Sequence, residues 1–245
     1  MTTLATASFL SHLKSIYPNN GIRNGNIINP WYIVAAVAFS ASNRPDAVPH
    51  VFQYAMKDLQ MEGHLGTNSL EGERLLARKL RDALFKSGLT SGYPRAINSL
   101  VALSEVMPEE LRDTKTMRRT ETPITEYEKT GRALFHNIYG DTADSVQSLL
   151  DGAYPDMGWF SNTIGYGLTY GFTEVLSPLE TSYTLVAALI AGDTPRQIGW
   201  HLDGARRGGA TFEEVQAVRR ISMEVASSAG VKWKDDVPEV KDAIS

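Results

Sequence analysis

The sequence predicts an all-α protein, and three observations support that prediction. Helix-start signals recur at 177–180, 194–197 and 211–214, where a Ser or Thr is followed three residues later by Glu or Gln. Apolar residues recur at steps of three and four, as in Phe212, Val215, Val218, Ile221 and Val225. Segments that alternate with a period of two are scarce, so strand signals are weak.

The individual helices follow from local patterns along the chain. Two apolar runs, 31–41 and 183–192, predict buried helices because both are shorter than the roughly 18 residues of a membrane span. Segment 71–88 predicts an amphipathic helix that Gly88 ends. Segment 160–172 predicts another, because its large residues recur at steps of four. Further helices are expected to begin near 178, 195 and 212.

An internal repeat predicts that one helical unit was duplicated and then diverged within one compact molecule. Each half runs from a buried helix to a Pro-started helix with one histidine, and then to an amphipathic helix. His50 and His201 fall at similar places in the two halves, within one residue. The predicted division is an N-terminal repeat (1–106), a charged linker (107–129) and a C-terminal repeat (130–245), with an insertion at 61–70.

Composition excludes several classes of function. The 245 residues include no cysteine, which removes disulfides, thiolate zinc sites and cysteine nucleophiles. The net charge of −4, without a basic patch, argues against nucleic acid as a partner. The five histidines lack metal-binding spacing, and no phosphate-binding loop occurs, so neither a metal nor a cofactor is expected.

The same features indicate where the protein resides and predict no membrane insertion. The absence of cysteines fits an intracellular protein, for which the cytoplasm is the first expectation. A mitochondrial location is the alternative, because the first twenty residues are rich in Ser and Thr and contain no acid.

Residues 130–235 resemble the carboxymuconolactone decarboxylase domain. The resemblance is carried by "TGRALFHNIYGDTADSVQSLLDGAYPDMGWF", by Leu176-Ser177-Pro178, by His201 and Ala205, and by "GATFEE" at 209–214. It implies an all-helical fold of the alkyl hydroperoxidase D type that assembles into oligomers. It also implies one of two chemistries, either cofactor-free decarboxylation of a lactone acid or peroxide reduction by a Cys-x-x-Cys pair. Here the two cysteine positions are Thr194 and Gln197, so thiol peroxidase activity is excluded.

His201 is the first candidate catalytic residue. The helix expected over 195–207 places Ile198, His201, Leu202 and Ala205 on one side, so the imidazole points inward. A partly buried imidazole stays neutral and suits proton abstraction near pH 7, although a hydrogen-bonded core histidine would fit the pattern equally well.

Other residues are weighed around this histidine. Tyr166 and Tyr170 are candidate hydroxyls for stabilising an enolate oxygen, with interfacial packing as the alternative. Trp200, Gln197 and His50 are the candidate substrate-binding residues.

Two functions from different classes remain open. The first is a cofactor-independent lyase or isomerase that acts on a small oxygenated organic acid, lactone or enolisable carbonyl compound, with His201 moving the proton. The alternative is a non-catalytic helical oligomer that binds a small molecule or a protein. In both cases a homo-oligomer is expected, as a dimer, trimer or hexamer, because Trp31, Trp159 and Trp200 look exposed.

Overall fold

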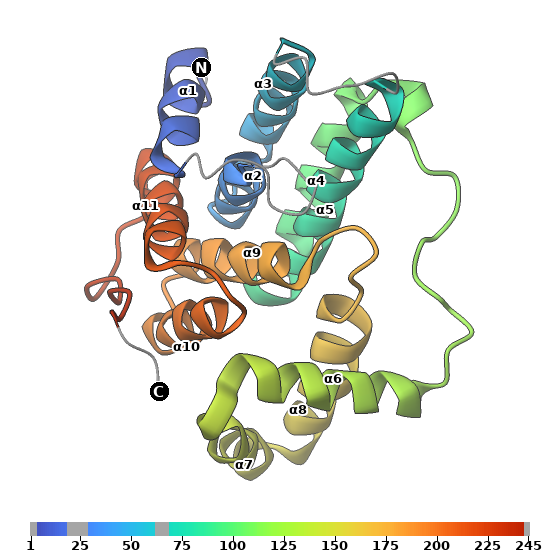
Figure 1. Ribbon diagram of the computed structural model, residues 1–245, viewed down its shortest axis with the longest axis vertical. Coiled ribbons are helices and arrows are strands. Elements are labelled where there is room, and N and C mark those ends of the chain that lie inside the picture. The colour runs from blue at the N-terminus through green and yellow to red at the C-terminus, as the bar shows by residue number, and fades with distance from the viewer. Residues whose placement is uncertain (1–3, 19–28, 62–68, 243–245) are drawn as a thin grey trace.

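The computed structural model describes residues 4–18, 29–61 and 69–242, and within them it is helical with no strand (Figure 1). The all-α prediction is therefore confirmed. Most of the predicted insertion at 61–70, and parts of the N-terminal twenty residues, lie outside the described residues. The elements are α1 (Ala7–Ile16), α2 (Trp31–Ala41), η1 (Pro45–Ala47), α3 (Val48–Met61), α4 (Ser69–Ser91), α5 (Tyr93–Val106), η2 (Glu109–Leu111), α6 (Ile124–Tyr139), η3 (Gly140–Thr142), α7 (Ala143–Ala153), α8 (Pro155–Phe160), η4 (Ser161–Tyr170), α9 (Pro178–Ala191), α10 (Pro195–Arg207) and α11 (Phe212–Ser228).

Helices α2 and α9 form the centre of the helical body, which comprises α1–α5 and α9–α11. Every residue of α2 is buried, and so is α9 from Thr181 to Ala191. The two helices pack on each other, with α4 and α11 against both and α10 against α9 (Figure 1). Both buried helices were predicted from their apolar runs. Within the described part of the chain, no helix is long and apolar enough to cross a membrane.

The turns that follow α2 and α9 have the same backbone conformation, 150 positions apart. Asn43 and Asp193 both adopt left-handed conformations, with φ of 58° and 53°. The amides of Ser42 and Gly192 bond to carbonyls four residues back in both turns, and a proline opens the next helix each time. Non-glycine residues with positive φ are uncommon, so their coincidence supports the internal repeat. The division at 106 and 129 stays a prediction, and α6 begins within the predicted linker.

The lower lobe, residues 124–170, contains α6, α7, α8 and η4 and lies beneath the helical body in Figure 1. Helices α6 and η4 pack backbone to backbone. A Cβ on Gly131 would lie 1.7 Å from the Asn162 carbonyl oxygen, and one on Gly167 would lie 2.1 Å from the Tyr127 carbonyl oxygen. Only glycine allows this approach, so these two residues determine how close the helices come.

The helix predicted over 160–172 is present, but η4 is a ten-residue π-helix. An i→i+5 hydrogen-bond register is rare and is frequently found at functional sites. Residues at steps of four lie close together in both α and π registers, so the sequence pattern did not distinguish them.

Two of the three predicted capping boxes are confirmed. At Ser177 and Thr211 the hydroxyl accepts from the backbone amide of the Glu three residues later, and that carboxylate accepts from the cap amide. The box at Thr194 is wrong, because Thr194 Oγ1 instead donates to the Leu189 carbonyl at 3.2 Å. Helix α10 still begins at Pro195, whose fixed φ suits the first helical position.

Candidate active site

His201 lies on the buried face of α10, together with Ile198, Leu202 and Ala205, as the helical spacing predicted. Only 5% of the residue is exposed. The opposite face of α10 is polar and ends in Arg206 and Arg207. This amphipathic pattern directs the imidazole towards the lower lobe.

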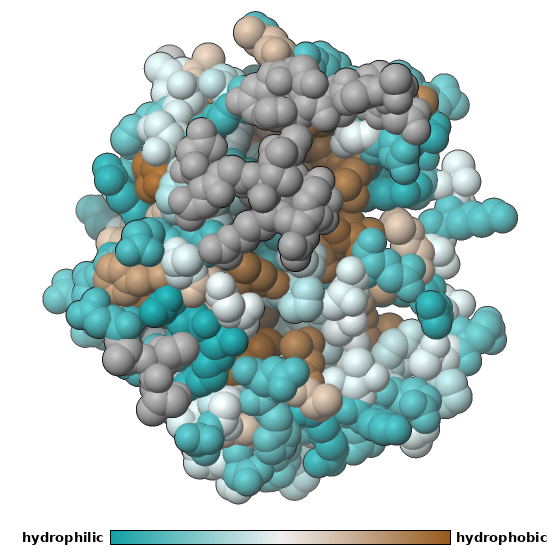
Figure 2. Space-filling model, in the orientation of Figure 1, coloured by the Kyte–Doolittle hydropathy of each residue, from teal (hydrophilic) through white to brown (hydrophobic). Residues whose placement is uncertain are grey.

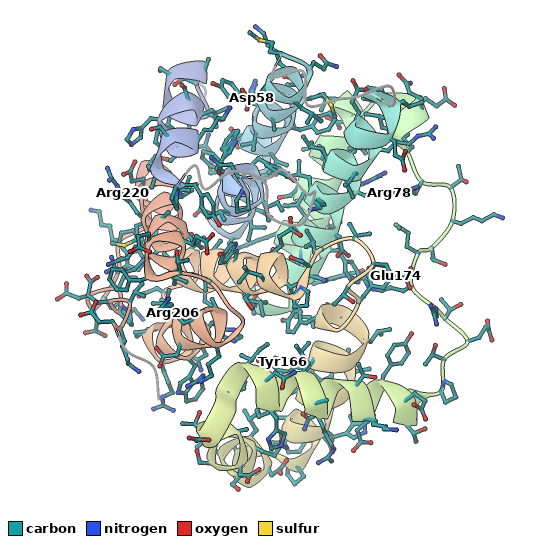
Figure 3. All side chains as sticks on the ribbon, in the orientation of Figure 1. Asp58, Arg78, Tyr166, Glu174, Arg206 and Arg220 are labelled. Atoms are coloured by element: carbon teal, nitrogen blue, oxygen red, sulfur yellow. The ribbon has the colours of Figure 1, made fainter. Side chains whose placement is uncertain are left out.

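The aromatic cluster that meets His201 consists of residues from α6, η4 and α10. Tyr166 and Tyr170 lie one turn apart on η4, with ring centres 5.4 Å apart. Tyr139 lies on α6, with its ring centre 5.9 Å from that of His201. In Figure 3, Tyr166 lies on the side of the lower lobe that faces the helical body. The members are Phe135, Tyr139, Tyr166, Tyr170, Trp200 and His201.

A chain of polar atoms runs through this cluster. The Tyr166 hydroxyl donates to the Tyr139 hydroxyl oxygen at 3.0 Å. His201 Nε2 lies 3.5 Å from the Tyr166 oxygen, at the outer limit of a hydrogen bond. The Tyr166 hydroxyl donates its proton to Tyr139, so towards His201 the Tyr166 oxygen can only accept a hydrogen bond. This assigns the ring proton of His201 to Nε2.

This tautomer leaves the lone pair of His201 Nδ1 free. Nδ1 is buried and has no hydrogen-bond partner among the described residues. A buried polar atom without a partner is rare and calls for an explanation. The proton of the Tyr139 hydroxyl likewise meets no acceptor within the described ranges. The site therefore offers one unpaired base and one unpaired donor.

Burial keeps every titratable group of the cluster neutral near pH 7. Desolvation lowers the pKa of His201 to about 4. Desolvation also raises the pKa of Tyr139, Tyr166 and Tyr170 above the usual value of 10.0. Among the described residues, no group of three or more His, Asp or Glu side chains could hold a metal ion. In its resting state the arrangement therefore offers hydrogen-bond acceptors and donors that carry no charge.

The other candidate residues are placed differently. Trp200 packs edge to face on Tyr139 at 5.7 Å between ring centres, so it lines the cluster. Gln197 lies one turn before His201 but is exposed. His50 is exposed on α3 and does not mirror His201, because the 150-residue offset aligns His201 with the fully buried Val51.

Sequence reasoning missed Tyr139 and Phe135. They lie one turn apart on α6, with ring centres 4.3 Å apart. Their i, i+4 spacing within "TGRALFHNIYG" was the available signal. It could not show which helix they would face, because that depends on how α6 packs against η4 and α10.

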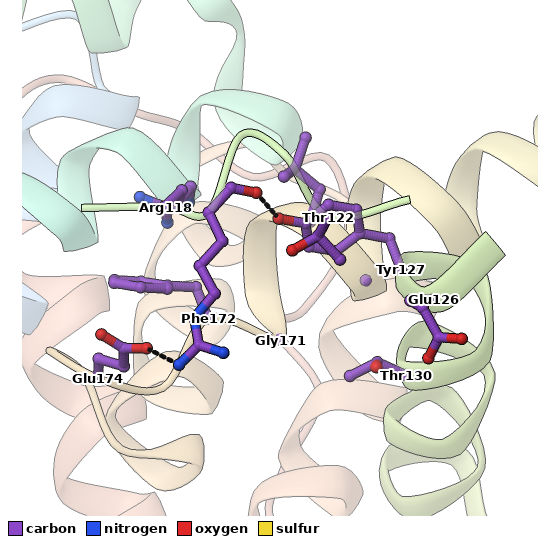
Figure 4. A pocket seen from close by; sticks show the side chains of 11 residues that line it. Arg118, Thr122, Glu126, Tyr127, Thr130, Gly171, Phe172 and Glu174 are labelled. Atoms are coloured by element: carbon purple, nitrogen blue, oxygen red, sulfur yellow. Dashed lines mark hydrogen bonds and ion pairs between the residues drawn. The ribbon is translucent and has the colours of Figure 1, made fainter. Parts of the chain in front are cut away.

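One pocket among the described residues lies away from the imidazole. It has a volume of about 190 Å³ and opens between residues 118–130 and the end of η4 (Figure 4). Arg118, Arg119, Tyr127 and Glu174 are among its lining residues, and no member of the aromatic cluster is. Figure 2 shows hydrophobic residues in the recess between the lower lobe and the helical body. Helices α6 and α10 pack across that boundary, and His201 lies on α10.

Comparison with known proteins gives two relatives, both named Peroxisomal protein 2. The protein from Schizosaccharomyces pombe is 34% identical over 206 residues, which cover 84% of this chain and 90% of the relative. The protein from Saccharomyces cerevisiae is 27% identical over an alignment of 287 positions, which covers 97% of this chain and 99% of the relative. No family model matches the chain. The identity to the fission yeast protein, over nearly its whole length, shows that this chain belongs to the Peroxisomal protein 2 family.

Proposed function

We propose that this protein is a cofactor-independent acid–base enzyme on a carboxymuconolactone decarboxylase-like helical scaffold. Its substrate is a small oxygenated organic acid, lactone or enolisable carbonyl compound, which it decarboxylates or isomerises. The observation that carries the proposal is the neutral, buried His201 imidazole, whose Nδ1 has no partner among the described residues. A general base needs an unprotonated atom that the surrounding fold leaves unused.

The geometry refines the roles that the sequence assigned. In the isomerisation, His201 Nδ1 takes the proton from the carbon next to the substrate carbonyl and returns it to a different carbon of the enolate. Tyr166 accepts from Nε2 and so orients the ring, while its own proton is held by Tyr139. The Tyr139 hydroxyl, whose proton is unused among the described residues, then stabilises the enolate oxygen. Tyr170, whose ring packs on Tyr166, walls the site.

Solvent-hydrogen exchange tests this proposal without knowledge of the natural substrate. A panel of β-keto acids, lactone acids and enolisable ketones is incubated in D₂O, and deuterium incorporation is followed by NMR. We expect the wild type to label at least one compound and His201→Gln to slow the labelling about a hundredfold. His136→Gln, which changes an exposed histidine on α6, is the matched control and should label at the wild-type rate.

The alternative, a non-catalytic helical oligomer that binds a small molecule or protein, is favoured by one observation. His201 is only 5% exposed, as expected for a histidine that serves packing rather than catalysis. If the wild type labels no compound in the panel, or if His201→Gln labels as fast as the wild type, the non-catalytic function replaces the enzymatic one.

We infer that the protein assembles with copies of itself. Two apolar surfaces support this, because large side chains stand exposed on adjacent helices. The surface on α4 and α5 consists of Phe85, Leu89, Tyr93, Ile97 and Val101. The surface on α7 and α8 consists of Leu149, Tyr154, Met157, Trp159 and Phe160. Such surfaces are typical of interfaces. Of the tryptophans that suggested an interface, Trp159 is exposed, but Trp31 is buried in the core.

Light scattering on the purified protein tests this assembly. We expect a mass that is a multiple of 26.9 kDa, and a lower mass for Trp159→Ser because that variant removes apolar area from the α7–α8 surface. Arg220→Ser, a change at an exposed position of α11, should keep the wild-type mass. A wild-type monomer at micromolar concentration would contradict the inference.

The name of both relatives points to the peroxisome. We infer the same location for this chain, in place of the cytoplasm or the mitochondrion that composition suggested. Co-localisation of a fluorescent fusion with a peroxisomal marker checks it, and a diffuse signal would contradict it.

A further inference from the structure

Lys86 is a buried cation that the proposed chemistry does not use. It lies on α4 and is 0% exposed. Its Nζ donates to the Phe172 carbonyl at 2.7 Å, to Thr181 Oγ1 at 2.8 Å and to the Tyr170 carbonyl at 3.5 Å. Two of these three acceptors are backbone carbonyls at or just beyond the end of η4.

Arg118 approaches the same helix end from the segment before α6. Its guanidinium donates to the Thr169 carbonyl at 3.3 Å and to Asp82 Oδ1 at 2.7 Å. The rings of Phe85 and Phe172 lie on it, 4.3 and 4.6 Å from the guanidinium carbon. Arg118 is therefore fixed by four contacts rather than free in solvent.

Asp82 links the two cations. Its other oxygen, Oδ2, lies 3.4 Å from Lys86 Nζ, and its side chain is only 6% exposed. Burial lowers the pKa of Lys86 to about 8, and the Asp82 carboxylate opposes that shift, so Lys86 remains largely protonated at pH 7. Buried charges are costly unless they are paired, and both cations pair with Asp82, although Asp82 Oδ2 and Arg118 Nε have no hydrogen-bond partner among the described residues.

The end of a helix is where such cations act most strongly. The last carbonyls of a helix lack partners within it, and the helix dipole places partial negative charge there. A π-helix is rare, so its presence in η4 calls for a local cause. Arg118 and Lys86 bond the carbonyls of Thr169 and Tyr170, the last two residues of η4.

We propose that Asp82, Lys86 and Arg118 form a cap that holds η4 in its π register, and that they are thereby positioning residues for Tyr166 and Tyr170. A change to the α register would place different residues on the face of η4 that meets His201. The importance of this cap for turnover rests on the proposed function, but its effect on the Tyr166–His201 contact does not.

The ring nitrogens of His201 report this contact directly. We would record ¹H–¹⁵N long-range spectra at pH 7 and assign the His201 signals with His201→Gln. In Lys86→Met we expect the chemical shifts of the His201 nitrogens to change, because the end of η4 loses one of its two capping cations. Lys79→Met is the matched control, because it removes a buried lysine two turns away on α4 whose partner is Glu180 rather than η4.

A second pair decides the question if Lys86→Met does not fold. Arg118→Met removes the other capping cation, which is partly exposed, and should also move the His201 signals. Arg119→Met, at the neighbouring and 80% exposed arginine, should leave them unchanged. Wild-type His201 signals in folded Arg118→Met overturn the proposal, as do equal shifts in the control variants. Because no turnover is measured, this result is separate from the exchange test.

Discussion

Replacing Gly131 by alanine is expected to lower the free energy of unfolding by about 3 kcal/mol or more. The new Cβ would lie 1.7 Å from the Asn162 carbonyl oxygen, 2.6 Å from the Gly167 nitrogen and 2.8 Å from the Asn162 carbonyl carbon. All three atoms belong to the backbone of η4, so no side-chain rotation relieves the clash. Helices α6 and η4 would have to separate, and the Tyr139–Tyr166 hydrogen bond joins those two helices.

Gly199→Ala is the matched control for this substitution. Gly199 lies inside α10, and a Cβ there meets no atom within 4 Å. Alanine favours a helix interior over glycine, so we expect a gain of about 1 kcal/mol. Urea unfolding followed by circular dichroism measures both variants. A Gly131→Ala protein as stable as the wild type would show that α6 and η4 do not pack this closely.

Lowering the pH from above 6.5 to below 4 is expected to reduce the free energy of unfolding by about 3 kcal/mol through protonation of His201. Burial holds the pKa of His201 at about 4 in the folded state, against an ordinary value of 6.5. Between these two pKa values the imidazole of His201 is protonated in the unfolded chain and neutral in the folded protein. The stabilisation is complete above pH 6.5 and is lost as the pH falls towards 4.

The contribution of His201 is isolated by comparing the wild type with His201→Gln. Carboxylates titrate in the same range in both proteins, so the informative quantity is the difference between their unfolding free energies. We expect that difference to change by about 2 kcal/mol between pH 7 and pH 5, with the wild type losing more. Parallel curves would mean that His201 is solvated or charged, and the proposed general base would be lost with it.

Local signals in the sequence predicted much of the helical body. The apolar runs at 31–41 and 183–192 correspond to the buried α2 and the buried part of α9, and the boxes at Ser177 and Thr211 begin α9 and α11. These features depend on residues within one or two turns of each other, so they can be predicted directly from the sequence. Thr194 shows where local signals fail to predict a hydrogen bond, because its hydroxyl donates to a carbonyl near the end of α9 instead of accepting from an amide of α10.

The sequence by itself determined the helical class, the buried helices, the inward direction of His201 and the absence of thiol chemistry. Only the tertiary structure decided what His201 meets. Tyr166 is 35 positions from His201 and Tyr139 is 27 positions from Tyr166. The contact between these side chains depends on Gly131 and Gly167, which let α6 and η4 pack closely. It also depends on the π register of η4, which a spacing of four residues in the sequence does not distinguish from an α-helix. Such contacts are fixed by packing between distant segments, whereas caps and periodicity are fixed by neighbours along the chain.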